Sequence, residues 1–337
     1  MTRPNKRYQV VGIGNAIVDI ISPAEDRFLE RMKIRKGIMQ LIERDRAEFL
    51  YARMEDRQRS PGGAVANTLA GLGNLGLATA FIGRVRDDAL GRFYVSALRA
   101  QGTDFPNAPT ANTPIAGPAL PTSRSMIFVS PNGERSMNTY LGISAEVGPE
   151  DVPPQVAEQA EILFLEGYLY DKPKGKAAFE QAARLCRQAG GRTGIALSDP
   201  FCVDRHRADF HRLLGTMDYA IGNEHEWMSL YQTEDLGGAL AQAARQTEVI
   251  VCTRAEQDVI VMQGAERVRV PVRVIPPVDA TGAGDQFAAG FLYGLAQRRD
   301  LLTAGRMGCI AAGEVISHFG ARPQQDLKAM FAEQGLL

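Results

Sequence analysis

The sequence has almost no excess of charge of either sign. Its 38 lysine and arginine residues are balanced by 39 aspartate and glutamate residues, which leaves a formal net charge of −1 over 337 residues. A protein that is held on nucleic acid or on an anionic membrane by electrostatic attraction needs a basic excess or a basic stripe. The composition therefore argues against both partners and favours an enzyme or binding protein for small molecules. The length allows roughly two domains.

Cysteine is also scarce. The chain has four cysteines and no C-x-x-C pair, whereas a disulfide framework in a chain this long usually needs more. The first apolar stretch carries Asp19 and has no cleavage-type tail, which predicts no signal peptide. The most apolar stretch, residues 69–83, is too short and too rich in glycine to span a bilayer. We expect a cytoplasmic protein, and the sequence leaves open whether it is a monomer or a homodimer.

Two common nucleotide-binding motifs are missing. No G-x-x-x-x-G-K-[S/T] loop occurs, which excludes a Walker-type phosphate loop. Gly12 and Gly14 follow the first strand-like run, but Ile17 occupies the third glycine position of a dinucleotide-binding fingerprint. This mismatch disfavours a nicotinamide-dependent dehydrogenase.

Strand-like and helix-like segments alternate along most of the chain. This pattern predicts an α/β fold, doubly wound, with a mostly parallel sheet flanked by helices. Strand-like runs are expected at residues 8–13, 79–85, 162–169, 193–199, 218–223 and 249–254. The runs at 259–264 and 266–274 predict an antiparallel excursion, with Pro271 on an edge strand.

Two segments, 22–60 and 104–142, interrupt this alternation and carry strand-like runs of their own. In the second, Asn132-Gly133 separates two such runs, which is typical of a hairpin. Ligands of open α/β sheets lie at the carboxyl ends of the strands, so we expect these segments to form a small β-sheet lid over that edge. The remaining segments, 1–21, 61–103 and 143–337, would form a large domain that binds nucleotide and substrate.

The first candidate site lies in the run P-V-D-A-T-G-A-G-D-Q-F, residues 277–287. A glycine-rich turn opens an apolar helix there, so the free amides of Gly282, Ala283 and Gly284 and the positive helix end meet at one spot and predict an anion hole. Asp285 follows directly, and a carboxylate beside an anion hole is suited to accept a proton from a hydroxyl. The alternative is an aspartate that only caps the helix.

Two further candidates are glycine-rich turns near the N-terminus. Gly62 and Gly63 allow the backbone to touch a ligand, and Asn67 offers both a donor and an acceptor. Asn15 and Asp19 follow the first strand, where a carboxylate can accept from the two hydroxyls of a vicinal diol. For each motif, an ordinary turn with a capping residue is the alternative.

Taken together, P-G-G-A-V-A-N at 61–67, V-D-A-T-G-A-G-D-Q-F at 278–287 and G-N-A-I-V-D at 14–19 resemble the PfkB carbohydrate kinase family, the ribokinase-like group. The resemblance runs from about residue 8 to about 325. It implies ATP as a co-substrate and Mg²⁺ as a cofactor. Asn223 and Glu226 resemble the family's Asn-x-x-Glu element, which would organise magnesium and phosphate through water.

Within the family, the spacing of Asn15 and Asp19 resembles that of adenosine kinases, in which the pair holds the ribose hydroxyls. By the same resemblance, Arg135 is the lid arginine that reaches the transferred phosphate, and Asp279, with carbonyls around residues 317–320, would hold K⁺ or another monovalent cation. The resemblance implies a purine slot walled by three residues, Met39, Leu41 and Tyr168.

The residues expected to contact ATP match the family's motifs at some positions and differ from them at others. The resemblance implies that ATP contacts Asn223, Thr253, Thr281, Gly282 and Gly284. The family's Thr-x-Gly-x-x-Gly element is Thr253-Arg-Ala-Glu-Gln-Asp258 here, so both glycines are missing. This difference concerns the backbone contacts near the adenine of ATP.

These observations predict a transferase that phosphorylates the 5′-hydroxyl of a nucleoside, with adenosine converted to AMP in purine salvage. The alternative is a sugar kinase of the same family, acting on ribose, fructose or a keto-sugar acid. An apolar purine slot would discriminate between them. A catalytically silent nucleotide sensor is disfavoured because it has no chemical need for Asp285.

Overall fold

The computed structural model describes residues 6–111 and 119–337. Within these ranges the strands form a nine-stranded sheet and a five-stranded sheet. The large sheet has the order β14-β13-β12-β11-β10-β9-β1-β5-β6 and is parallel from β12 to β6. Its strands are β1 (Tyr8–Ile13), β5 (Thr79–Ile82), β6 (Thr103–Asp104), β9 (Ala160–Glu166), β10 (Arg192–Ala196), β11 (Tyr219–Asn223), β12 (Val249–Arg254), β13 (Gln257–Gln263) and β14 (Glu266–Val270).

Side chains of the central strands alternate between two apolar cores. In β9, Ile162 and Phe164 join the core on one face of the sheet, whereas Leu163 and Leu165 join the core on the other. Because both faces are buried, the middle of β9 is apolar without interruption from Ile162 to Leu165. The predicted doubly wound α/β fold is therefore confirmed.

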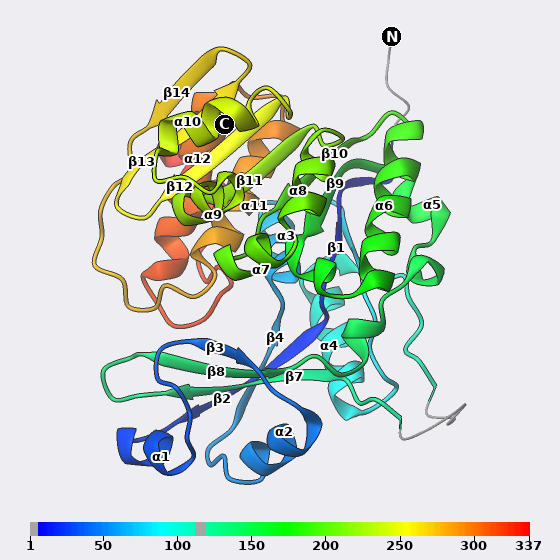
Figure 1. The fold of residues 1–337 in the computed structure, drawn as a ribbon, viewed down its shortest axis with the longest axis vertical. Helices are drawn as coiled ribbons and strands as arrows, with labels where there is room; N and C mark the ends of the chain where they lie inside the picture. The colour runs from blue at the N-terminus through cyan, green and yellow to red at the C-terminus, as the bar shows by residue number, and fades with distance from the viewer. Residues whose placement is uncertain (1–5, 112–118) are drawn as a thin grey trace.

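Helices cover both faces of the large sheet (Figure 1). One layer contains α3 (Ala64–Asn74), α4 (Ala89–Ala100), α11 (Ala283–Ala296), α12 (Leu301–Ile316) and α13 (Leu327–Glu333). The other contains α5 (Pro154–Ala157), α6 (Pro173–Gln188), α7 (Pro200–Arg205), α8 (Arg207–Leu214), α9 (Glu224–Tyr231) and α10 (Leu236–Ala243). Short 3₁₀ turns occupy Gly142–Glu146, Pro149–Asp151 and Gly167–Asp171. No helix in the described ranges has an apolar stretch long enough to cross a bilayer.

The five-stranded sheet lies outside the large sheet and its helices, in the lower part of Figure 1. Its order is β3-β8-β7-β2-β4, with β2 (Ile17–Pro23), β3 (Met39–Leu41), β4 (Gln58–Gly62), β7 (Ser123–Val129) and β8 (Arg135–Tyr140). The predicted hairpin is confirmed, because β7 and β8 pair antiparallel around Gly133, whose φ is +82°. Helices α1 (Asp26–Arg31) and α2 (Arg44–Tyr51) belong to the same part of the chain.

The ends of this small sheet differ by a few residues from the predicted domain boundaries. β2 already begins at Ile17, only three residues after β1 ends, and β4 runs to Gly62. The division into a large domain and a lid remains a prediction.

The antiparallel excursion through β13 and β14 is confirmed, but the prediction of Pro271 inside the edge strand was wrong. β14 ends at Val270, because proline lacks the amide that the ladder needs.

Candidate active site

The entrance of α11 forms an open set of backbone donors. Gly282 caps the helix with φ +81°, a left-handed conformation that favours glycine. A Cβ atom there would lie 2.7 Å from the Cα atom of Ala321, so close packing also requires glycine. The Ala283 amide donates to the carbonyl of Ala280 at 3.3 Å, whereas within the described residues the amides of Gly282 and Gly284 have no protein acceptor. These two amides and the helix end can bind an anion.

Asp285 lies on the first turn of this helix. Its Oδ2 accepts a hydrogen bond from Asn67 Nδ2 at 3.0 Å, and its backbone carbonyl accepts from Thr68 Oγ1 at 3.1 Å. Burial raises the pKa of the Asp285 carboxyl to about 6, while the Asn67 hydrogen bond and the charge of Arg322 act in the opposite direction. The carboxyl can therefore accept a proton near neutral pH beside an anion hole.

Asp19 on β2 lies directly over the glycine pair that precedes α3. A Cβ atom on Gly62 would be 2.4 Å from Asp19 Oδ2, and one on Gly63, whose φ is +95°, would be 2.3 Å from the carbonyl oxygen of Asn15. Gly62 thus makes room for the Asp19 carboxylate, and Gly63 makes room for the Asn15 carbonyl. Burial raises the pKa of Asp19 to about 7, against the attraction of Arg322 and Arg135.

Asn15 is held by a glutamate that the sequence analysis missed. Glu166, at the carboxyl end of β9, accepts from the Asn15 amide at 2.8 Å and from Asn15 Nδ2 at 3.3 Å. Ser144 Oγ donates to Asn15 Oδ1 at 3.2 Å. Burial raises the pKa of Glu166 to about 7. A charged residue that ends a buried parallel strand was the available signal.

Arg135 and Asp279 are brought together as a buried ion pair. Arg135 Nη2 on β8 lies 2.5 Å from Asp279 Oδ2, and the Arg135 Nε is buried without a partner among the described residues. Asp279 also accepts from the amides of Thr281 at 3.1 Å and Gly320 at 2.8 Å. A monovalent cation at this carboxylate would have to share it with Arg135.

Asn223 and Glu226 form a reciprocal cap at the start of α9. Glu226 accepts from the Asn223 amide at 2.8 Å and from Asn223 Nδ2 at 2.7 Å, while Asn223 Oδ1 accepts from the Glu226 amide at 2.9 Å. Burial raises the pKa of Glu226 to about 7. Thr253 pairs with Asn223 across β11 and β12. No cluster of three or more potential metal ligands occurs in the described ranges.

The three residues expected to wall a purine slot lie on two different elements. Met39 and Leu41 are on the edge strand β3, with exposed fractions of 42% and 52%. Tyr168 follows β9, and its hydroxyl donates to the carbonyl of Ser198 at 3.3 Å. The small sheet therefore offers exposed apolar side chains, and the large sheet contributes an aromatic ring.

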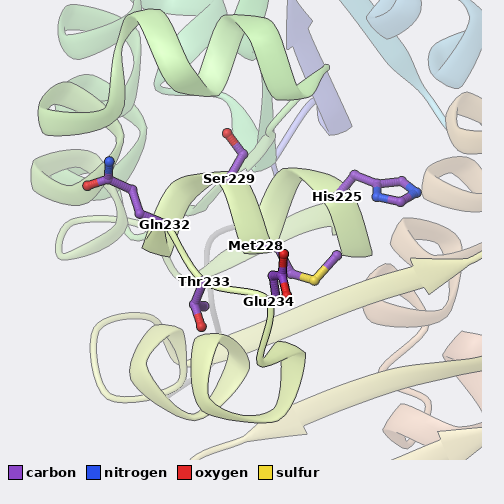
Figure 2. A pocket seen from close by; sticks show the side chains of 6 residues that line it. All are labelled: His225, Met228, Ser229, Gln232, Thr233 and Glu234. Atoms are coloured by element: carbon purple, nitrogen blue, oxygen red, sulfur yellow. The ribbon is translucent and has the colours of Figure 1, made fainter.

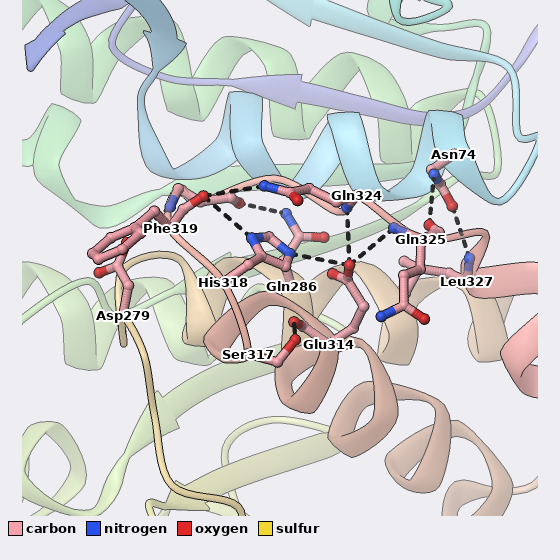
Figure 3. Close-up of polar contacts among 12 residues, drawn as sticks. Asn74, Asp279, Gln286, Glu314, Ser317, His318, Phe319, Gln324, Gln325 and Leu327 are labelled. Carbon is pink, nitrogen blue, oxygen red and sulfur yellow. Dashed lines mark hydrogen bonds and ion pairs between the residues drawn. The ribbon is translucent and has the colours of Figure 1, made fainter.

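A second residue that the sequence analysis missed is Arg322, in the loop between α12 and α13. Its Nε donates to Asn67 Oδ1 at 3.2 Å. Figure 3 shows how this loop is fixed: Glu314 accepts from the amides of Gln324 and Gln325, each at 2.9 Å, and from His318. No motif in the sequence marked this arginine.

A surface hollow on α9 lies apart from these groups. It is lined by His225, Met228, Ser229, Gln232, Thr233 and Glu234 (Figure 2). None of the predicted site residues lines it. We therefore place the candidate active site at the entrance of α11 rather than in this hollow.

A doubly wound sheet with a second small sheet beside it is the fold of the ribokinase-like kinases. Residues 37–327 match the model of the pfkB family carbohydrate kinases, and the chain belongs to this family. It is a kinase that acts on a sugar or a nucleoside.

Similar proteins fall into both groups. The chain is 46% identical to the adenosine kinase from Sinorhizobium meliloti (98% of this chain and 99% of that chain, TM-score 0.89). It is 44% identical to a probable sugar kinase protein from Rhizobium etli (98% and 100%, TM-score 0.91). A fructokinase from Klebsiella pneumoniae is 28% identical over 295 residues, which cover 84% of this chain and 83% of the relative.

Proposed function

We propose that the protein transfers the γ-phosphoryl group of ATP to the 5′-hydroxyl of a nucleoside, with adenosine as the acceptor and AMP and ADP as the products. The observation that carries this proposal is the Asp285 carboxylate beside the amides of Gly282 and Gly284, which have no protein acceptor in the part of the chain that the structure describes. Asp285 takes the proton of the hydroxyl, the hydroxyl oxygen attacks the γ-phosphorus, and the bond to ADP breaks. The amides stabilise the charge on the migrating group, and each such donor contributes about 3 kcal/mol in comparable sites.

The acceptor would lie between the two sheets. Asp19 accepts from the ribose hydroxyls, Asn15 is oriented by Glu166 and Ser144, and Met39, Leu41 and Tyr168 contact the base. The segments 22–60 and 104–142 act as a lid that excludes water, because water would otherwise compete as the acceptor. The support for this arrangement is that Arg135 of the small sheet already contacts Asp279 beside α11.

Asn223, Thr253 and Thr281 face the donor nucleotide in this proposal. Single carboxylates fit a metal that arrives with the nucleotide, and both Glu226 oxygens already accept hydrogen bonds from Asn223. Glu226 and Asn223 would therefore hold Mg²⁺ through water. When bound, Mg²⁺ supplies positive charge to the phosphates.

A sugar is the second candidate acceptor. The fructokinase relative and the probable sugar kinase neighbour favour it. The buried Glu166 adds a second carboxylate near Asp285, which would suit a polyhydroxylated acceptor.

The test is a panel of acceptors with ATP and Mg²⁺, scored by ADP release and by mass spectrometry of the product. Adenosine, inosine, ribose, fructose and a keto-sugar acid cover the alternatives. We expect the highest kcat/KM with adenosine and phosphate on its 5′-oxygen. A higher kcat/KM with a free sugar would overturn the nucleoside assignment, and no acceptor-dependent ADP release at all would overturn the kinase mechanism.

A further inference from the structure

The Arg322 side chain forms hydrogen bonds with α3 and with the end of α4. Its Nε donates to Asn67 Oδ1 on α3 at 3.2 Å, and its Nη1 donates to Gln101 Oε1 after α4. Its Nη2 is buried and has no partner among the described residues. Arg322 is half-buried as a residue, but an unused charged donor that is itself buried is costly to desolvate, so this position needs a reason other than stability.

The contact with Arg322 determines which way the Asn67 amide faces. An asparagine amide presents an acceptor on one side and a donor on the other. Because Arg322 can only donate, it holds Oδ1, and this leaves Nδ2 facing Asp285 Oδ2 at 3.0 Å. Arg322, Asn67 and Asp285 thus form one directed hydrogen-bond chain. Arg322 favours this orientation in both protonation states of Asp285, whereas the carboxyl itself requires the Nδ2 donor only when it is ionised.

The backbone that carries Arg322 is itself tied to the same helices. Gln286 Nε2, one residue after Asp285, donates to the carbonyls of Asn67 at 2.8 Å and Ala321 at 2.9 Å. Glu314 then anchors the following residues, as Figure 3 shows. The loop therefore has little freedom to withdraw the guanidinium from Asn67.

Charged groups from several elements surround Asp285. Asp19 on β2 and Glu166 on β9 are the neighbouring carboxyls, and Arg322 is the cation whose charge acts directly on Asp285. Arg135 on β8 acts on Asp19, and Tyr94 on α4 faces Arg322. Arg322 is thus placed to offset an accumulation of negative charge around the proposed base.

We propose that Arg322 is a positioning residue for phosphoryl transfer, which through Asn67 orients Asp285 and keeps it ionised for proton acceptance. This inference rests on the proposed function, since it assigns Asp285 as the base. Two observations support it: the hydrogen-bond chain from Arg322 through Asn67 to Asp285, and the charge of Arg322 that acts directly on this carboxyl. A purely structural arginine would lack both the chain and the electrostatic effect.

The test compares Arg322→Gln and Arg322→Lys with wild type by the pH dependence of kcat/KM. The wild-type acid limb is expected near pH 6, the value that burial gives Asp285. Arg322→Gln removes a positive charge, so the acid limb is expected to move upward by about one pH unit and kcat to fall about 10- to 100-fold. Arg322→Lys keeps the charge and should return most of the shift, although it lacks the fork of donors.

Arg86→Gln is the matched control, because Arg86 is another buried arginine whose side chain donates to the carbonyls of Leu120 at 2.8 Å and Ala111 at 2.6 Å. It should lose stability and leave the acid limb unchanged. An unchanged acid limb in Arg322→Gln, with stability lowered as in the control, would overturn the proposal. If Arg322→Gln does not fold, Arg322→Lys decides the question: with the charge kept and the fork of donors lost, kcat should fall while the acid limb stays close to that of wild type, and an unchanged kcat would overturn the proposal.

A readout that needs no turnover separates this inference from the kinase assignment. Carboxyl ¹³C NMR of aspartate-labelled protein, with the Asp285 signal identified by its loss in Asp285→Asn, follows the titration directly. An upward shift of this titration in Arg322→Gln supports the positioning role even if no acceptor is phosphorylated. A titration that does not move refutes it even if the kinase assignment holds.

Discussion

Arg135 on β8 and Asp279 in the segment before α11 form a buried ion pair, with 2.5 Å between Arg135 Nη2 and Asp279 Oδ2. Removing one member leaves the other charge buried without compensation, which costs about 3–5 kcal/mol. We expect Arg135→Met and Asp279→Asn each to lower the free energy of unfolding by about that amount. The double variant should lose less than the sum, and urea unfolding of all four proteins measures the coupling. Strict additivity would show that the pair contributes no coupling.

Asp285→Asn separates a base from a helix cap. Asparagine caps a helix as well as aspartate does, but it cannot take up the proton. Turnover should fall about 10²- to 10⁴-fold while acceptor affinity stays nearly unchanged. Steady-state ADP release and calorimetric acceptor binding test this. Asp300→Asn is the control, because Asp300 caps α12 through the Thr303 amide at 2.9 Å, and it should leave turnover intact. Near-wild-type turnover in Asp285→Asn would eliminate Asp285 as the base.

Asp19→Ala should act mainly on acceptor binding. Losing a charged hydrogen-bond acceptor for the substrate hydroxyls costs about 1.5–3 kcal/mol, so the KM for the acceptor should rise about 10- to 100-fold with a smaller change in kcat. Asp45→Ala, an exposed carboxylate on the neighbouring helix α2, is the control. The ribose-diol assignment fails if the acceptor KM of Asp19→Ala matches that of the control.

Glu166 predicts a pH-dependent stability. Because burial raises its pKa from 4.5 to about 7, the folded protein binds this proton more tightly than the unfolded chain. Its contribution to stability is therefore fully present below about pH 4.5 and lost as the pH rises through 7, on the order of 3 kcal/mol in total. Glu166→Gln cannot titrate, so its unfolding free energy should decline less over this range. Chemical denaturation at several pH values measures the difference, and parallel curves would contradict it.

Ala255→Gly tests the missing glycine at the β12–β13 turn. Ala255 has φ +49°, a conformation that costs an L-residue energy and that glycine adopts freely. The variant should be stabilised by about 0.5–1 kcal/mol. Ala329→Gly, on the exposed side of α13, should be destabilised instead. Thermal unfolding compares the two, and destabilisation of both would mean that the turn gains nothing from glycine.

The strand pattern and the glycine motifs of this fold are readable from local sequence. Ile162 to Leu165 are apolar without a break because the strand is covered on both faces, and the positive φ of Gly282 belongs to a glycine-rich turn. Both features depend on a few neighbouring residues. The turn at Ala255 keeps a positive φ although the family's glycine is absent there.

The hydrogen-bond partners in the site depend on contacts between distant segments. Asn67 and Asp285 are 218 residues apart, and Asn15 and Glu166 are 151 residues apart. The partners of Glu166 and Arg322, Asn15 and Asn67, are distant in the sequence, so the roles of both residues appear only when the strands and loops are assembled. The same limit applies to Arg135, whose pairing with Asp279 no local pattern indicates.

The topology has a consequence for the order in which the molecule is synthesised. All five strands of the small sheet lie before residue 141, whereas Asp279, Asp285 and Arg322 lie in the last fifth of the chain. On the ribosome, where N-terminal segments emerge first, Asp19 and its glycine pair can assemble while the groups around α11 are still untranslated. A nascent chain paused between residues 141 and 278 would carry Asp19 and its glycine pair without the groups that would perform the transfer.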